Sequence, residues 1–371
     1  MKRFVVAFTV LFLAAGAADA ANGLRVVSAG PVGEVATLAE ANEIRVVFSE
    51  PMVVLGKIPN PVTAPFFRIE PAVKGTFRWS GTTTLIFTPN PSLPFATQYT
   101  VTIDKSAKSV GGKTLDQEYR WTFTTPTIRL LSTDWYRKGG RADAPVVIAL
   151  RFNQPVDPKT ILPHLQLRTE AHAPPDVAIP EAGRARLQRL EPKALQAFEA
   201  KRAKAAAAAQ SGDEPVFAFL ATDWDKERFR PANTLVVLET KPGVPPETWI
   251  KVLIDDQVAQ SARHARAGRV QSFIIELDPM LFVRGMECVA GCDPEWRNDI
   301  YFRTGPGLSF EAVRKAVTVT DITDPAKETV LKPKEVSRDY DFPSSSYSLD
   351  ELGYTIQPAR TYAVRVDPSL T

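Results

Sequence analysis

Short stretches of alternating apolar and polar residues recur along the chain, and each ends at a proline or a turn. Residues 43–52 (EIRVVFSEPM) and 146–156 (VVIALRFNQPV) place apolar side chains at every second position and then reach a Phe-x-x-Pro. Alternation with a period of two predicts a β-strand with one buried face, and proline removes a donor from the ladder. A weaker third copy occurs at residues 300–306 (IYFRTGP).

A second pattern also occurs three times, downstream of the first. Residues 94–104 (PFATQYTVTID) match residues 245–255 (PPETWIKVLID) and residues 358–367 (PARTYAVRVD). Their alternation predicts three equivalent strands. The expected inward side chains are Tyr99, Val101 and Ile103 in the first copy, Ile250, Val252 and Ile254 in the second, and Tyr362, Val364 and Val366 in the third.

The repeated order of these strands predicts three modules of one kind. Several short strands, separated by turns rich in proline, glycine and asparagine, are typical of an antiparallel Ig-like β-sandwich. The fold class is therefore all-β, with tandem sandwiches expected at residues 21–126, 127–277 and 278–371. The expected aromatic core of the first sandwich consists of Trp79, Phe87, Tyr99, Trp121 and Phe123.

The second module carries an insert, because its segment from Phe152 to Asp255 is much longer than the matching segment from Phe48 to Asp104. Residues 184–209 (RARLQRLEPKALQAFEAKRAKAAAAA) are rich in helix formers, which predicts a helix with a break near Pro192. The helix is basic. Two interpretations stay open: a solvated helix on a β-domain, or a helix that touches an anionic surface.

The third module lacks a strand that the others have. The first module closes with Trp121-Thr122-Phe123, and the second closes around residues 270–273, but a matching strand for the third would fall beyond Thr371. An unpaired sheet edge is prone to mispairing. We therefore expect the third module to be incomplete and the chain to be the front part of a longer protein, or a truncated one.

The first 20 residues form an export signal. Lys2 and Arg3 precede an apolar run from Phe4 to about Ala18, and Ala18-Asp19-Ala20 is an A-x-A cleavage site. An uncleaved anchor is the alternative, but the run is shorter than the ~20 residues that cross a bilayer. We expect cleavage near Ala20 and export to the periplasm or cell surface. Association with a membrane or the cell surface stays open, although the chain does not encode it.

Export changes the interpretation of the two cysteines, Cys288 and Cys292. In an oxidising compartment thiols tend to pair, so we expect a local disulfide that closes a small loop. A redox dithiol is disfavoured because the spacing is not C-x-x-C. Zinc would need two further ligands, and no histidine is near in sequence.

Composition argues for an ordinary folded protein without obvious chemistry. Of 371 residues, 44% are hydrophobic and 23% charged, which excludes general disorder, and a net charge of +3 gives no indication of nucleic-acid binding. No nucleophile elbow, metalloprotease, P-loop or dinucleotide motif occurs. The three histidines are His164, His172 and His264, each in a separate context. We expect no enzyme activity and no cofactor or metal.

The motifs together resemble the opening modules of bacterial α2-macroglobulin-like proteins. The resemblance rests on residues 44–52 (IRVVFSEPM), 66–71 (FFRIEP) and 84–89 (TLIFTP), on the helical insert, and on the cysteine segment before the third module. It covers nearly all of the chain after residue 20, and its motifs also occur in Ig-like modules of other surface proteins.

That resemblance implies a protease trap, in which a bait segment is cut and a thioester in a Cys-x-Glu-Gln motif can capture the attacking protease. Neither Cys288 nor Cys292 is followed by x-Glu-Gln, so the chain contains no thioester motif. The implied function is the non-enzymatic N-terminal scaffold of an exported endopeptidase inhibitor, whose partners are proteases met through the full-length protein. The alternative is a structural or adhesive surface protein built of Ig-like domains.

Overall fold

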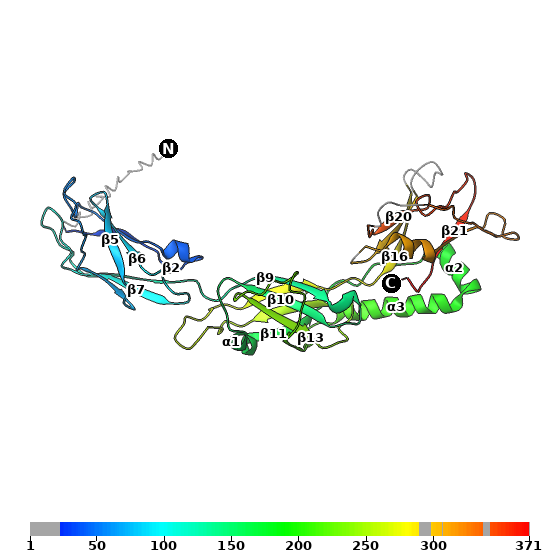
Figure 1. Ribbon diagram of the computed structural model, residues 1–371, viewed down its shortest axis with the longest axis horizontal. Helices are drawn as coiled ribbons and strands as arrows, with labels where there is room; N and C mark the ends of the chain where they lie inside the picture. The colour runs from blue at the N-terminus through cyan, green and yellow to red at the C-terminus, as the bar shows by residue number, and fades with distance from the viewer. Residues whose placement is uncertain (1–22, 289–297, 306, 337–341, 371) are drawn as a thin grey trace, which may run out of the picture. The chain divides into compact units, whose positions relative to one another are not determined.

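The chain forms three β-sandwiches, each with its own apolar core (Figure 1). The computed structural model describes residues 23–288, 298–305, 307–336 and 342–370. The chain divides into two compact units: one ends at Thr127 and includes Arg263–Ala265, and the other contains the remaining residues from Ile128 onward. The first sandwich lies in the first unit, and the second and third sandwiches lie in the second unit.

The first sandwich consists of two four-stranded sheets. One has the order β1 (Val26–Gly30), β3 (Ile44–Phe48), β6 (Thr84–Pro89), β5 (Gly75–Ser80). The other has the order β2 (Gly33–Glu34), β8 (Tyr119–Thr124), β7 (Gln98–Ile103), β4 (Phe67–Glu70). All pairs are antiparallel except β2 with β8. A 3-10 turn, η1, spans Leu38–Ala41.

The predicted core of the first sandwich is confirmed. The side chains of Phe87, Tyr99, Trp121 and Phe123 are buried, and Trp79 is partly buried against them. They come from both sheets, so the two inner faces share one core, as alternation along each strand requires.

The second sandwich has a four-stranded and a three-stranded sheet. The first has the order β12 (Ala218–Leu220), β13 (Leu235–Thr240), β10 (Val146–Phe152), β9 (Leu130–Arg137). The second has the order β11 (Leu165–Glu170), β14 (Trp249–Ile254), β15 (Gln271–Glu276). The turn η2 (Lys138–Gly140) joins β9 to β10 within one sheet, and α1 (Pro158–Ile161) and η3 (Leu162–His164) lie between β10 and β11, which belong to different sheets.

The predicted helical insert of the second sandwich is confirmed, including its break. Helix α2 spans Glu181–Leu190 and helix α3 spans Pro192–Gln210. The break falls at Glu191, whose backbone is not helical, because proline favours the first position of a new helix. None of the helices that the structure describes is long and apolar enough to cross a membrane.

The third sandwich has two three-stranded sheets and a short helix. The sheets have the orders β16 (Phe282–Cys288), β17 (Asn298–Arg303), β20 (Ser346–Ser348) and β19 (Thr329–Val330), β18 (Val317–Asp321), β21 (Tyr362–Val366). Helix α4 (Phe310–Ala316), which the strand pattern did not predict, starts where the Ser309 side chain accepts a hydrogen bond from the Ala312 N–H. Among the described residues β21 pairs with β18. The expected incompleteness of the third module stays a prediction.

Candidate functional site

The residues predicted to form a disulfide are not both described. Cys292 lies outside the described residues, and for Cys288 only the backbone at the end of β16 is described. The disulfide therefore stays a prediction. The predicted signal segment, residues 1–20, also lies outside the described residues.

The three histidines are held in three different surroundings. His164 Nδ1 lies 2.9 Å and 3.0 Å from the two carboxylate oxygens of Asp255. His172 stacks on Trp249 with 4.2 Å between ring centroids. His264 is half-buried in another loop. Within the described ranges no three His, Cys, Asp or Glu side chains gather in a way that would hold a metal ion.

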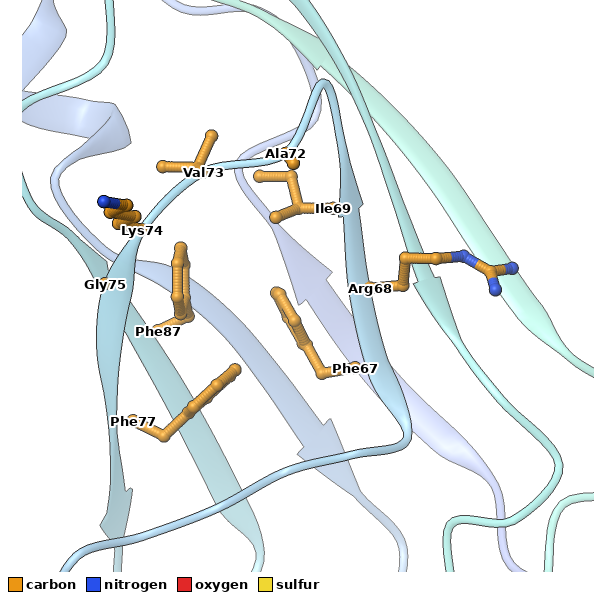
Figure 2. Close-up of a pocket in the computed structure, with 9 residues that line it drawn as sticks. All are labelled: Phe67, Arg68, Ile69, Ala72, Val73, Lys74, Gly75, Phe77 and Phe87. Carbon is orange, nitrogen blue, oxygen red and sulfur yellow. The ribbon is translucent and has the colours of Figure 1, made fainter.

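A shallow aromatic hollow lies on the first sandwich (Figure 2). Its volume is about 430 Å³. Phe67 comes from β4, Phe77 from β5 and Phe87 from β6, with 4.9–5.4 Å between the three ring centroids. Because β4 and β5 are the outermost strands of their sheets, the hollow lies where the sandwich opens at its side.

Gly75 allows β5 to cross over the aromatic rings. A Cβ atom at this position would lie 2.5 Å from Cζ of Phe87 and would also clash with the backbone oxygen of Thr88. In Figure 2 the Arg68 side chain points away from the rings. Apart from Arg68 and Lys74, the residues that line the hollow are apolar. The period-two pattern places each phenylalanine on the inner face, but does not show that three of them meet at one open side.

A second candidate surface, called here the insert face, is the side of α3 that packs on the start of the third sandwich. The rings of Phe198 and Phe282 meet edge to face at 5.9 Å, and Ala205 and Met280 are buried beside them. The Lys201 ammonium lies 5.2 Å from the centre of the Phe282 ring, and burial lowers the pKa of Lys201. A fully solvated insert is therefore the wrong interpretation for this side of α3.

Two bidentate ion pairs join α2 and the helix break to the third sandwich. The guanidinium of Arg186 donates to both carboxylate oxygens of Glu328 at 2.6 Å. Arg365, on β21, donates to both oxygens of Glu191 at 2.8 Å and 2.7 Å. These hydrogen bonds lower the pKa of Glu328 and of Glu191. Because each guanidinium binds both oxygens of its carboxylate, the pair fixes the relative orientation of the two side chains as well as their distance.

A buried carboxylate lies where the second sandwich meets the third. The side chain of Glu247 is 1% exposed and accepts hydrogen bonds from both terminal nitrogens of Arg303 and from the backbone N–H of Met280. Beside it, the buried Arg137 donates to Asp278 at 3.0 Å and to the Val244 carbonyl at 2.9 Å. The insert face, the bidentate pairs and this joint bind the two sandwiches to each other.

Comparison with known proteins confirms the resemblance found in the sequence. Residues 20–125 match the family model described as a bacterial Ig-like domain. An α2-macroglobulin homolog from Nostoc sp. is 27% identical over 148 residues, which is 38% of this chain and 8% of that protein. The chain thus spans a small part of the length of this relative.

Two solved structures of Escherichia coli α2-macroglobulin are also similar. The crystal structure spanning domains MG0-NIE-MG1 is 11% identical, covering 94% of this chain and 92% of that one, with a TM-score of 0.24. The cryo-EM reconstruction of the native conformation is 12% identical, covering 95% of this chain and 19% of that one, with a TM-score of 0.26. Both TM-scores are low, and the fold rests on its own strand order and cores.

Proposed function

We propose that the chain is the N-terminal scaffold of an exported α2-macroglobulin-like endopeptidase inhibitor. The observation that carries this proposal is the 27% identity to the Nostoc α2-macroglobulin homolog over 148 residues. The scaffold itself is non-enzymatic, contains no thioester motif, and uses residues 1–20 as its export signal.

The structure supports a mechanical role. In the second unit, buried and bidentate contacts join the two sandwiches, so a displacement of one sandwich would move the other with it. An inhibitor that changes shape when a protease cuts it needs parts that move as bodies around parts that yield. We infer that the contacts of Glu247, Glu191 and Glu328 hold the second and third sandwiches together as one such body.

The test is incubation of the full-length protein with a panel of endopeptidases. We expect cleavage at one preferred region, followed by loss of protease activity on large protein substrates while activity on small peptide substrates is retained. Absence of both effects would reject the inhibitor and favour the alternative, a structural or adhesive protein of the cell surface.

A further inference from the structure

One end of the first sandwich carries an apolar turn that lies outside its core. The loop between β3 and β4 exposes three aliphatic side chains: Val54 is 48% exposed, Leu55 80% and Ile58 42%. Single exposed apolar residues are ordinary on a protein surface, but several that gather together mark a contact with another surface. These three residues are called here the apolar tip.

The turn at the apolar tip has a defined backbone shape. The Lys57 N–H donates to the Val54 carbonyl at 3.0 Å, and Gly56 has a φ of +76°. A four-residue turn with a positive φ at its third position is a type II turn, which favours glycine there. Leu55 occupies the second position, so the backbone itself presents this side chain to the outside.

Both sides of the loop that bears the tip are fixed to the sandwich. The Met52 N–H donates to the Thr82 carbonyl at 2.7 Å, and Val62 forms a bridge with Phe77 of β5. A preorganised loop loses less conformational freedom on binding than a flexible one.

The loop between β7 and β8 lies beside this loop and adds to the same end of the sandwich. The Val110 N–H donates to the Pro51 carbonyl at 2.8 Å, and the Val110 side chain is 53% exposed. Two neighbouring loops therefore expose aliphatic side chains at one end of the sandwich.

The charges on the two loops are basic. Residues 51–66 and residues 105–115 contain no Asp or Glu, although acidic residues border both stretches. The two stretches contribute four exposed lysines, Lys57, Lys105, Lys108 and Lys113. Lys113 pairs with Glu50 at 2.6 Å, and in the described part of the chain no carboxylate forms an ion pair with the other three. The apolar tip is thus accompanied by positive charge that the fold does not neutralise.

The chain enters the first sandwich at this same end. The Leu24 N–H donates to the Thr114 carbonyl at 3.2 Å, and the Arg25 N–H donates to Oγ of Ser49 at 3.0 Å. Thr114 belongs to the loop between β7 and β8, and Ser49 belongs to the loop that bears the tip. The start of β1 is therefore held between the two loops.

This entry point limits how far the tip can lie from a membrane during export. In the sequence the apolar run of the expected export signal ends near Ala18, five residues before Gly23. Five residues span at most about 18 Å. While the apolar run lies in a bilayer, the end of the sandwich that carries the tip is held close to the surface of that bilayer.

We propose that the apolar tip docks on the phospholipid bilayer that the chain crosses during export, with Leu55 below the headgroups and the lysines beside the phosphates. Burial of apolar side chains and attraction of basic residues to anionic lipids act together in peripheral membrane binding. A lipid surface takes up an exposed turn without a matching shape, which a protein partner would have to supply. Only the identity of the bilayer rests on the proposed function, because export is part of that function.

The test uses the chain from Ala21 onward, so that the export signal cannot itself bind lipid. The protein is sedimented with vesicles of phosphatidylglycerol and phosphatidylcholine in equal amounts, and separately with vesicles of phosphatidylcholine alone. We expect binding to the anionic vesicles that weakens as salt is added, because salt screens the lysines. No binding to the anionic vesicles at low salt would overturn the proposal.

A matched pair of variants, Leu55→Asp and Val32→Asp, tests the tip itself. Val32 is 63% exposed and follows β1 at the opposite end of the same sandwich. Both side chains are mostly exposed, so we expect both variants to fold, as circular dichroism would show. Since Leu55 would be buried in lipid, we expect L55D to bind anionic vesicles at least about tenfold more weakly than V32D.

The contribution of charge is tested by Lys57→Gln, which we expect to weaken binding to anionic vesicles about fivefold and to leave binding to neutral vesicles unchanged. Equal vesicle binding by L55D and V32D would overturn the proposal. So would a dimer of the chain that L55D dissociates without any change in vesicle binding, because the tip would then contact a second copy.

Protease inhibition by the full-length protein is measured separately. If the protein binds anionic vesicles through Leu55 but inhibits no protease, the proposed function is rejected and the docking tip stands. If it inhibits proteases but L55D binds vesicles as well as V32D does, the docking tip is rejected and the proposed function stands.

Discussion

Replacing Glu247 by glutamine should loosen the joint between the second and third sandwiches more than any exposed ion pair does. The carboxylate is 1% exposed and accepts hydrogen bonds from Arg303 and from the Met280 N–H. Glutamine keeps one acceptor oxygen and turns an amide N–H₂ toward the guanidinium, so Arg303 loses its counter-charge.

The expected cost follows from this geometry. Breaking a fully buried ion pair costs about 3–5 kcal/mol, and a hydrogen bond to a charged group contributes about 1.5–3 kcal/mol. Since the Arg303 side chain is 27% exposed and water can reach it, we expect a lower value. A loss of about 2–3 kcal/mol corresponds to roughly 30- to 150-fold faster local opening.

Hydrogen exchange measured by mass spectrometry is the suitable assay, because a chain with several cores does not unfold in one step. In E247Q we expect amide hydrogens of β14 and β17 to exchange faster than in the unchanged chain, and those of the first sandwich to exchange at the same rate. Glu170→Gln is the matched control, since its partner Lys251 and Glu170 itself are each about one third exposed, and we expect it to cost at most about 1 kcal/mol. If E247Q and E170Q behaved alike, the assignment of Glu247 as a buried joint would be refuted.

Three further predictions concern other parts of the chain. Gly75→Ala should destabilise the first sandwich by about 1–3 kcal/mol, because the new Cβ meets the Phe87 ring and the Thr88 carbonyl. At Gly111 the atoms nearest to a new Cβ are 3.7 Å away, so Gly111→Ala should change the stability of the sandwich little. Unfolding of the two variants in urea compares their stabilities. Arg365 lowers the pKa of Glu191, so their ion pair stabilises the fold fully above the ordinary carboxyl pKa of about 4.3. This contribution is lost as the pH falls through the lowered pKa. Glu191→Gln should therefore make the stability of the fold depend less on pH in the acid range, as unfolding monitored by circular dichroism would show. The two cysteines of the exported protein should react with a thiol reagent only after reduction, as mass spectrometry would show; alkylation without reduction would contradict the predicted disulfide.

The repeated strands of this protein could be predicted because each carries a local alternation of apolar and polar residues. The inward positions that alternation predicts in β7 and β14 are all buried, although Thr102, an outward position by this pattern, is buried as well. The insert helices were predictable for the same reason, since helix formers continue from residue 184 to residue 209 and Pro192 marks the break.

The contacts of the insert could not be predicted in this way. Arg186 and Glu328 are 142 positions apart, and Arg365 and Glu191 are 174 positions apart. Nothing in the local sequence of either partner shows that they meet. A basic helix is more often solvated than bound to an acidic surface, and its own sequence does not show that the third sandwich presents Glu328 to α2. The aromatic hollow was missed for a related reason: alternation gives the face of a side chain, but not its neighbours across two sheets.

Two kinds of contact hold β21, and they respond differently to solution conditions. Its outer face is fixed by charge, through Arg365 and Glu191 of the insert, and its ladder with β18 is made of backbone groups. An ion pair depends on pH and salt, whereas a ladder of N–H and C=O groups is nearly independent of both. Acid or high salt should therefore loosen the attachment of the insert to β21 and leave the pairing of β18 with β21 in place.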